Sequence, residues 1–211
     1  MSYQIKEIFY TLQGEGINTG RPAVFCRFSG CNLWSGNEAS RKNAICKFCD
    51  TDFVGTNGTL GGKYETAVKL SQTVSELWPK NKQFNKFVVL TGGEPMLQVN
   101  GDLIDALHNL DFEIAVETNG TIICPAEIDW ICVSPKFGSD LLQKTGEELK
   151  LVFPQTGFFP NKFLKLDFKH FLIQPMDGPM IEENTKMAIN FCQENPQWKL
   201  SIQTHKIMGI R

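Results

Sequence analysis

The sequence predicts an α/β protein whose mostly parallel strands form an incomplete, TIM-like barrel with about three helices. Short β-rich runs recur along its 211 residues, and several are almost continuously apolar, as is typical of parallel strands covered on both faces. Only three segments have a convincing helical period, whereas a complete eightfold barrel needs about eight helices and usually ~250 residues. Because strand–helix alternation alone does not distinguish them, a doubly wound open sheet is the alternative.

The expected strands are short runs rich in β-branched and aromatic residues, and most of them end in turn or polar residues. In chain order they are Lys6–Tyr10, Ala23–Phe28, Lys86–Thr91, Glu113–Glu117, Trp130–Ser134, Leu149–Phe153, Phe171–Gln174 and Lys199–Gln203.

The expected helices carry apolar residues at helical spacing. In the first, Leu70, Val74 and Leu77 share one face, and Pro79 ends the helix; Pro196 ends the third in the same way. The three helices are expected at Tyr64–Trp78, Asp102–Leu110 and Ile181–Asn195.

Length and composition indicate a single domain over residues 1–211, with a cysteine-loop insertion at about 31–50. A formal net charge of -2 without a Lys/Arg cluster argues against a nucleic-acid-binding surface. No apolar run approaches the ~20 residues of a membrane span, and the N-terminus lacks the apolar core of a signal peptide. Seven cysteines are an odd number for a disulfide framework. A soluble, cytoplasmic protein is expected.

Three cysteines form the most informative motif. Cys31, Cys46 and Cys49 are spaced C-x14-C-x2-C. Structural zinc sites and ordinary iron–sulfur carriers take four ligands, so three thiolates favour an iron–sulfur cluster with one iron open to a ligand. A zinc site completed by a distant histidine, a thioredoxin-like pair and inert thiols remain alternatives. The other four cysteines are best interpreted as small buried hydrophobes.

Polar, glycine-bearing segments follow five successive predicted strands. Ligands of α/β folds bind at the carboxyl ends of the strands, so these segments predict a ligand-binding rim. They are TGGEP at 91–95, ETNG at 117–120, SPK at 134–136, QPMD at 174–177 and QTHK at 203–206.

The cysteine loop and TGGEP together resemble the radical S-adenosylmethionine superfamily, although the first cysteine interval is much longer than the usual C-x3-C-x2-C. Read with YTLQGEG at 10–16, FCRFSGCNLW at 25–34, CDTDFVG at 49–55, ETNG, QPMDG and QTHK, the chain resembles the 7-carboxy-7-deazaguanine synthase family over nearly its whole length. That family contracts a carboxy-tetrahydropterin to the deazapurine precursor of queuosine and related compounds.

The resemblance implies that Cys31, Cys46 and Cys49 bind a 4Fe–4S cluster, and that its open iron chelates S-adenosylmethionine. Thiolates suit such a cluster, and Gly93 lets backbone approach the cofactor's amino acid end. Taken alone, Gly92–Gly93 could be a plain turn and Glu94 a helix N-terminal charge. The implied cofactor-binding residues are Phe48, Cys49, Asp50, Gly93, Glu94, Ser134, Pro135, Lys136, Gln174, Pro175, Met176 and Asp177.

The same resemblance implies a pterin site and a Mg²⁺ ion. Arg27 can form a bidentate pair with the substrate carboxylate, although an isolated arginine in a strand would more often be solvated or salt-bridged. The hydroxyl of Thr51 is a hard oxygen ligand suited to Mg²⁺. The implied substrate-binding residues are Leu12, Gln13, Gly14, Arg27, Thr91, Glu117, His205 and Arg211.

The resulting prediction is a radical enzyme that converts 6-carboxy-5,6,7,8-tetrahydropterin to 7-carboxy-7-deazaguanine with loss of ammonia. Its implied partners are an electron donor such as flavodoxin or ferredoxin and a second copy of the chain, with neither nucleic acid nor membrane. The alternatives are an activating enzyme of the glycyl-radical type and a non-catalytic cysteine–metal binding module.

Overall fold

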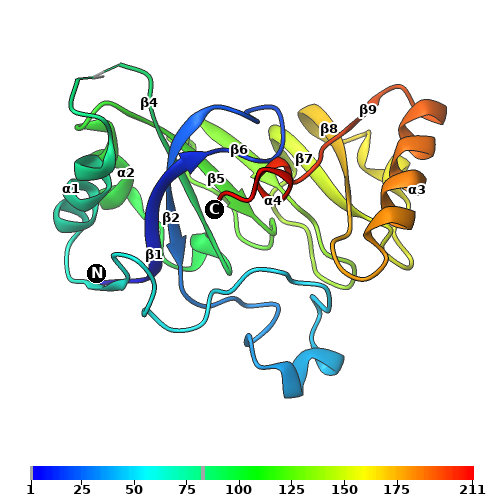
Figure 1. Ribbon diagram of the computed structural model, residues 1–211, viewed down its shortest axis with the longest axis horizontal. Helices are drawn as coiled ribbons and strands as arrows, with labels where there is room; N and C mark the ends of the chain where they lie inside the picture. Colours follow the sequence, from blue (N-terminus) through cyan, green and yellow to red (C-terminus); the bar gives the residue numbers. More distant parts are fainter. Residues whose placement is uncertain (1, 82–83) are drawn as a thin grey trace.

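The structure is a computed structural model that describes residues 2–81 and 84–211. Its strands form one nine-stranded sheet in the order β3-β1-β2-β4-β5-β6-β7-β8-β9 (Figure 1). From β2 onward neighbouring strands are parallel, whereas β1 is antiparallel to both β2 and β3. Over the described residues the sheet stays open. The predicted class, a mostly parallel α/β sheet with few helices, is confirmed.

The strands are β1 (Tyr3–Leu12), β2 (Pro22–Phe28), β3 (Gly62–Tyr64), β4 (Lys86–Gly92), β5 (Phe112–Thr118), β6 (Trp130–Val133), β7 (Thr145–Phe153), β8 (Asp167–Pro175) and β9 (Trp198–Leu200). The α-helices are α1 (Ala67–Leu77), α2 (Gly101–His108), α3 (Ile181–Glu194) and α4 (Thr204–Met208). None of the helices in the described part is long and apolar enough to cross a membrane.

The two faces of the sheet differ in chemistry. Side chains alternate along a strand, and the register aligns Arg27 with Thr91 and Glu117 with Cys132, so one face is polar near the carboxyl ends. The opposite face is apolar and is covered by α1 and α2 at one end and by α3 at the other (Figure 1). Because the helices bury only the apolar face, the polar face is left for a site.

The first predicted helix starts too early. Tyr64 fits the helical period but pairs with Tyr3 as part of β3. The Thr66 side chain then caps α1 by accepting a hydrogen bond from the Lys69 backbone N–H at 3.1 Å. The second and third helices lie where they were predicted and end slightly earlier, at His108 and Glu194.

The last predicted strand is also corrected. β9 spans only Trp198–Leu200, and the chain leaves the sheet before Gln203. It turns back over the sheet, where the Thr204 N–H donates to the carbonyl of Gly14, in the loop after β1, at 2.9 Å and the short helix α4 begins. QTHK therefore opens a helix over the polar face, as the red segment of Figure 1 shows.

The cysteine loop protrudes below the sheet and carries a short 3-10 helix, Glu38–Asn43 (Figure 1). Arg41 of that turn stacks on Trp34 at 3.9 Å from the ring centroid. Its guanidinium also donates to the carbonyls of Lys47 and Cys49, at 3.2 and 3.1 Å. The insertion is thus fixed against the backbone of the C-x2-C pair.

Candidate functional site

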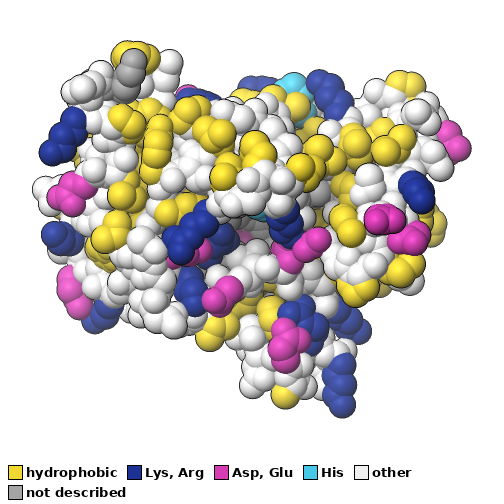
Figure 2. Space-filling view, viewed as in Figure 1, with side chains coloured by type: hydrophobic (Ala, Val, Ile, Leu, Met, Phe, Trp, Pro, Cys, Tyr) yellow, Lys and Arg dark blue, Asp and Glu magenta, His cyan; other side chains and the backbone are white. Residues whose placement is uncertain are grey.

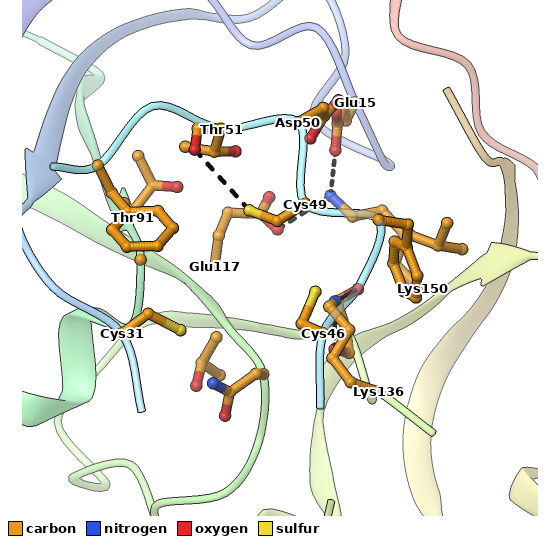
Figure 3. A pocket seen from close by; sticks show the side chains of 18 of the residues that line it. Glu15, Cys31, Cys46, Cys49, Asp50, Thr51, Thr91, Glu117, Lys136 and Lys150 are labelled. Carbon is orange, nitrogen blue, oxygen red and sulfur yellow. Dashed lines mark hydrogen bonds and ion pairs between the residues drawn. The ribbon is translucent and has the colours of Figure 1, made fainter. Parts of the chain in front are cut away.

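A cavity of about 210 Å³ opens on the polar face of the sheet, at the carboxyl ends of the parallel strands. Three thiols, from Cys31, Cys46 and Cys49, face into it from the cysteine loop, while charged side chains of β5 and β7 line its floor (Figure 3). The position agrees with the ligand-binding rim predicted from the sequence.

The three thiols surround a shared space. Cys31 accepts a hydrogen bond from the Leu33 N–H at 3.4 Å, and the Cys49 sulfur lies 3.8 Å from the Thr51 carbonyl. A hydrogen bond from the Cys46 thiol lowers the pKa of Cys49 to about 6, against the opposing effect of burial. In the described part of the chain, no three His, Cys, Asp or Glu side chains converge closely enough to hold a single metal ion.

Gly92 and Gly93 bring the end of β4 against the start of the cysteine loop. A Cβ on Gly93 would lie 2.0 Å from the Gly30 carbonyl oxygen and 2.9 Å from the Cys31 Cβ. Gly92 has φ of 129°, a conformation that L side chains rarely adopt. The glycine pair is therefore what allows Cys31 to sit beside the sheet.

Glu94 does not line the cavity. Its side chain is fully buried and accepts hydrogen bonds from the Met96 N–H at 3.0 Å and from the Thr118 hydroxyl and the Asn119 N–H, both at 2.8 Å. Burial raises the pKa of this carboxyl. In this structure Glu94 ties the end of β4 to the end of β5.

Lys136 places a cation beside the thiols. Its Nζ donates to the Ser134 carbonyl at 2.7 Å and to the Ser134 hydroxyl at 2.6 Å, and it lies 5.9 Å from the Phe48 ring centroid. Figure 3 shows its side chain next to Cys46. Burial lowers the pKa of Lys136, while the neighbouring thiols oppose that effect.

A lysine between two carboxylates forms the floor. Lys150 Nζ lies 2.7 Å from Glu15 Oε2 and 2.9 Å from Glu117 Oε2, and its side chain is only 4% exposed. Gln13 donates to Glu117 Oε1 at 3.4 Å and Gln203 to Glu15 Oε1 at 2.8 Å, so every oxygen of the two carboxylates has a protein donor. Burial tends to raise the pKa of Glu15, but the ion pair with Lys150 and hydrogen bonds bring it to about 2.

Arg27 faces the cavity and is also salt-bridged. Its Nε donates to Glu7 Oε1 at 2.9 Å. The terminal Arg211 lies near the same pair: its guanidinium is 3.8 Å from Glu7 and donates to the Thr59 hydroxyl, and its carbonyl accepts from Thr11 at 2.9 Å. Both roles weighed for Arg27, pocket residue and ion-pair partner, coexist.

The C-terminal segment covers the rim of the cavity. Lys206 contacts Asp50 of the cysteine loop at 2.5 Å and Asp177 after β8 at 2.6 Å. Gln203 reaches from Glu15 to Asp50, to which it donates at 3.1 Å. Hydrogen bonds and ion pairs thus connect three rim segments that are far apart in sequence.

Similarity to known proteins identifies the family. The chain is 62% identical over 211 residues to the 7-carboxy-7-deazaguanine synthase of Bradyrhizobium diazoefficiens, and the match covers 100% of both chains. It is 56% identical over 210 residues to that of Caulobacter vibrioides, again with 100% of each chain covered. The chain belongs to the 7-carboxy-7-deazaguanine synthase family.

The structural comparison agrees with this family assignment. The crystal structure of QueE from Escherichia coli has a TM-score of 0.72 and 26% identity, and the match covers 96% of this chain and 94% of that one. No protein-family model matches the chain. The resemblance seen in the sequence is confirmed, and with it the prediction of a radical S-adenosylmethionine lyase of queuosine biosynthesis.

The residues that the 7-carboxy-7-deazaguanine synthase resemblance implied fall into two groups. Those that line the cavity are Gln13, Arg27, Cys31, Cys46, Phe48, Cys49, Asp50, Thr51, Thr91, Gly93, Glu117, Ser134, Lys136, Gln174, Pro175 and Asp177. Those outside its lining are Leu12, Gly14, Glu94, Pro135, Met176, His205 and Arg211.

The structure shows why two of these residues, Leu12 and Gly14, lie outside the lining of the cavity. By its pairing with Pro22, Leu12 points to the opposite face of the sheet from Glu7 and Arg27. Gly14 makes room for the C-terminal helix, because a Cβ there would lie 2.3 Å from the Nδ1 of His205. Gln203, from the predicted rim segment QTHK, lines the cavity, and so do Glu15 and Lys150, which were not predicted as site residues.

The donor set fits the cofactors of the family. The three thiols that face one space provide soft ligands for an iron–sulfur cluster. The neighbouring Lys136 would offset part of the negative charge of bound thiolates, and the carboxylates of Asp50 and Asp177 lie on the same rim.

Proposed function

We propose that this chain converts 6-carboxy-5,6,7,8-tetrahydropterin to 7-carboxy-7-deazaguanine with loss of ammonia. One observation carries the proposal: a single cavity joins the three thiols of the cysteine loop to the charged floor formed by Glu15, Glu117 and Lys150. The first part suits a radical-generating cofactor pair, and the second suits a polar ring that is rich in hydrogen-bond donors. Figure 3 shows the side chains of both parts around the same cavity.

Cys31, Cys46 and Cys49 would hold a 4Fe–4S cluster, and the rim residues would hold S-adenosylmethionine. When bound, these groups supply the radical chemistry of the reaction. The backbone at Gly93 lines the cavity beside Cys31, and Ser134, Lys136, Gln174 and Asp177 line its rim. The chain's own contribution would be to hold the cofactor in the cavity next to the floor and to limit the access of water.

The pterin would lie on the polar face of the sheet. Arg27 faces the cavity and can attract the substrate carboxylate. Glu117 accepts hydrogen bonds and can read the amide and amino edge of the pterin ring. Thr51 lines the cavity directly after the cysteine motif, where its hydroxyl can bind a Mg²⁺ ion that also holds substrate oxygens.

The partners implied for this function are an electron donor and a second copy of the chain, and the expected location is the cytoplasm. The protrusion of the cysteine loop supports docking of an acidic electron carrier. Lys42 and Lys47 are exposed on it, and Figure 2 shows Lys and Arg side chains gathered on this lower lobe. A basic surface close to the cluster ligands would steer an anionic flavodoxin or ferredoxin toward the site.

Anaerobic turnover tests the proposal. The enzyme, reconstituted with iron and sulfide, is incubated with reductant, S-adenosylmethionine, Mg²⁺ and the carboxy-tetrahydropterin, and products are identified by mass spectrometry. We expect the deazapurine acid and ammonia from the unmodified chain and none from Cys46→Ala. Cys192→Ala is the matched control, because this half-buried thiol belongs to α3 and packs against the apolar core, outside the cavity. Product from Cys46→Ala would refute the cluster assignment, and a lack of product from the unmodified chain would refute the function.

A further inference from the structure

Lys150 is the buried cation of the charged floor. It lies on β7, its side chain is 4% exposed, and it makes ion pairs with Glu15 from the loop after β1 and Glu117 from β5. All three residues line the cavity. Figure 3 shows the ion-paired ammonium of Lys150 beside Glu15, on the side of the cavity away from Cys31.

Stability alone does not explain this arrangement. A buried lysine must be paired, but replacing a buried ion pair with apolar residues of similar volume is often neutral or stabilising. The neighbouring residues of β7 on the opposite face, Leu149 and Leu151, are fully buried in an apolar core. The charged trio is confined to the side that lines the cavity, which points to a ligand.

The trio also has an unequal charge. Two carboxylates share one ammonium group, so the three side chains together keep one net negative charge. Gln13 and Gln203 also donate to the carboxylates, but their amides are neutral and add no positive charge. Ionised carboxylates are acceptors only. A ligand that faces them gains by presenting two adjacent N–H donors rather than a carbonyl oxygen.

We propose that Lys150 is a positioning residue for the pterin ring, and that its ion pairs hold the carboxylates of Glu15 and Glu117 as acceptors for the ring edge that carries the amino group. This inference rests on the function proposed above and adds a determinant of specificity to it. Lys150 would act through the two carboxylates: its ammonium group, 2.7 Å from Glu15 and 2.9 Å from Glu117, fixes their positions, and the floor accepts hydrogen bonds from a 2-amino-4-oxo ring. A 2-oxo ring would place an oxygen against an acceptor.

The test compares two oxygen-stable probes on the reconstituted full-length enzyme by equilibrium dialysis. The first is 6-carboxypterin, which carries the 2-amino group, and the second is the 2-oxo analogue 6-carboxylumazine. Because a hydrogen bond to a charged group is worth a factor of roughly 10 to 100 in affinity, we expect the unmodified enzyme to prefer the amino probe by about that factor. Lys150→Met should bind the amino probe about tenfold or more weakly and lose most of the preference.

Two further variants separate this role from folding. Lys150→Arg keeps the charge and should keep the preference. The double variant Lys150→Met/Glu15→Gln restores the single negative charge and should recover part of the preference through Glu117. Lys86→Met is the matched control, because Lys86 is a buried lysine on the helix-covered face, where it donates to the Leu110 carbonyl at 2.9 Å. Its probe affinities should equal those of the unmodified enzyme.

Kinetics give a second readout. In turnover of the carboxy-tetrahydropterin, the Lys150→Met variant should show a larger increase in KM than decrease in kcat. A folded Lys150→Met enzyme that retains the preference for the amino probe would overturn the inference while leaving the proposed function intact. If the unmodified enzyme bound neither probe and formed no product, both the inference and the function would fail.

Discussion

Replacement of Gly93 by alanine tests how the end of β4 positions the cysteine loop. A Cβ at this position would lie 2.0 Å from the Gly30 carbonyl oxygen and 2.6 Å from the Gly30 carbonyl carbon. Ordinary van der Waals contact begins at 3.4 Å, so the loop would have to retreat by well over 1 Å. Both obstructing atoms belong to the backbone and cannot rotate away. The next residue is Cys31, so the movement displaces a cluster ligand.

The expected cost follows from the overlap. Overpacking of this kind destabilises proteins by about 1–3 kcal/mol, which for a chain of this size lowers Tm by roughly 3–9 °C. Gly101→Ala is the matched control, because a Cβ on Gly101 meets nothing within 4 Å. At the start of α2 the same substitution should be neutral or stabilise the protein by up to about 1 kcal/mol.

Two measurements check this prediction: thermal unfolding, and iron content after anaerobic reconstitution. We expect Gly93→Ala to unfold at lower temperature and to hold less iron per chain, whereas Gly101→Ala should match the unmodified protein in iron content. A Gly93→Ala protein with unchanged Tm and full iron content would refute the argument that glycine at this position sets the place of Cys31.

Three further predictions concern single side chains. Burial, together with the nearby Glu117, raises the pKa of Glu148 to about 7 from 4.5. The folded protein therefore holds the proton of Glu148 more tightly than the unfolded chain does, so the free energy of unfolding should fall by about 2–3 kcal/mol as pH rises from about 4.5 to 7. Urea titrations of Glu148→Gln should lack that decline. An equal decline in both proteins would contradict the raised pKa of Glu148. Lys206→Met should change the free energy of unfolding by less than about 1 kcal/mol, because its ion pairs with Asp50 and Asp177 are partly exposed. The Kd of the Lys206→Met variant for S-adenosylmethionine should nevertheless rise, because the C-terminal segment loses its ion pairs with the rim of the cavity. An unchanged Kd in equilibrium dialysis would count against a role of Lys206 in covering the rim. Thr51→Val should lower turnover and abolish its dependence on added Mg²⁺, and a retained Mg²⁺ dependence would exclude Thr51 as the ligand.

The parts of the fold that follow from local periodicity were predictable. The apolar runs predicted the central strands. Because parallel strands have their carboxyl ends at the same edge of a sheet, TGGEP, ETNG and SPK were expected around one cavity, and residues of all three segments line it. Tyr64 was misassigned because it fits the period of the following helix, whereas pairing with Tyr3, a distant residue, decides its structure. The helix α4 was missed, since five residues are too few to show a period.

The unpredicted site residues owe their roles to tertiary contacts. Lys150 sits in the run KLVF, where a single charged residue could equally well have faced solvent at the edge of a sheet. Only the register of β7 next to β6 turns it toward Glu117. Lys206 was part of a recognised motif, but its contacts with Asp50 and Asp177 span 156 and 29 residues of sequence. A lysine inside a predicted apolar strand is the signal that would have pointed to the floor of the cavity.

The proposed function depends on a cluster that the three thiols of Cys31, Cys46 and Cys49 would hold with one iron open to S-adenosylmethionine. The most direct measurement is electron–nuclear double resonance of the one-electron-reduced cluster with S-adenosylmethionine labelled by ¹⁷O in its carboxylate and ¹⁵N in its amino group. We predict hyperfine coupling from both labels in the unmodified enzyme. A fully loaded, reduced cluster that shows no coupling to either label would contradict the account.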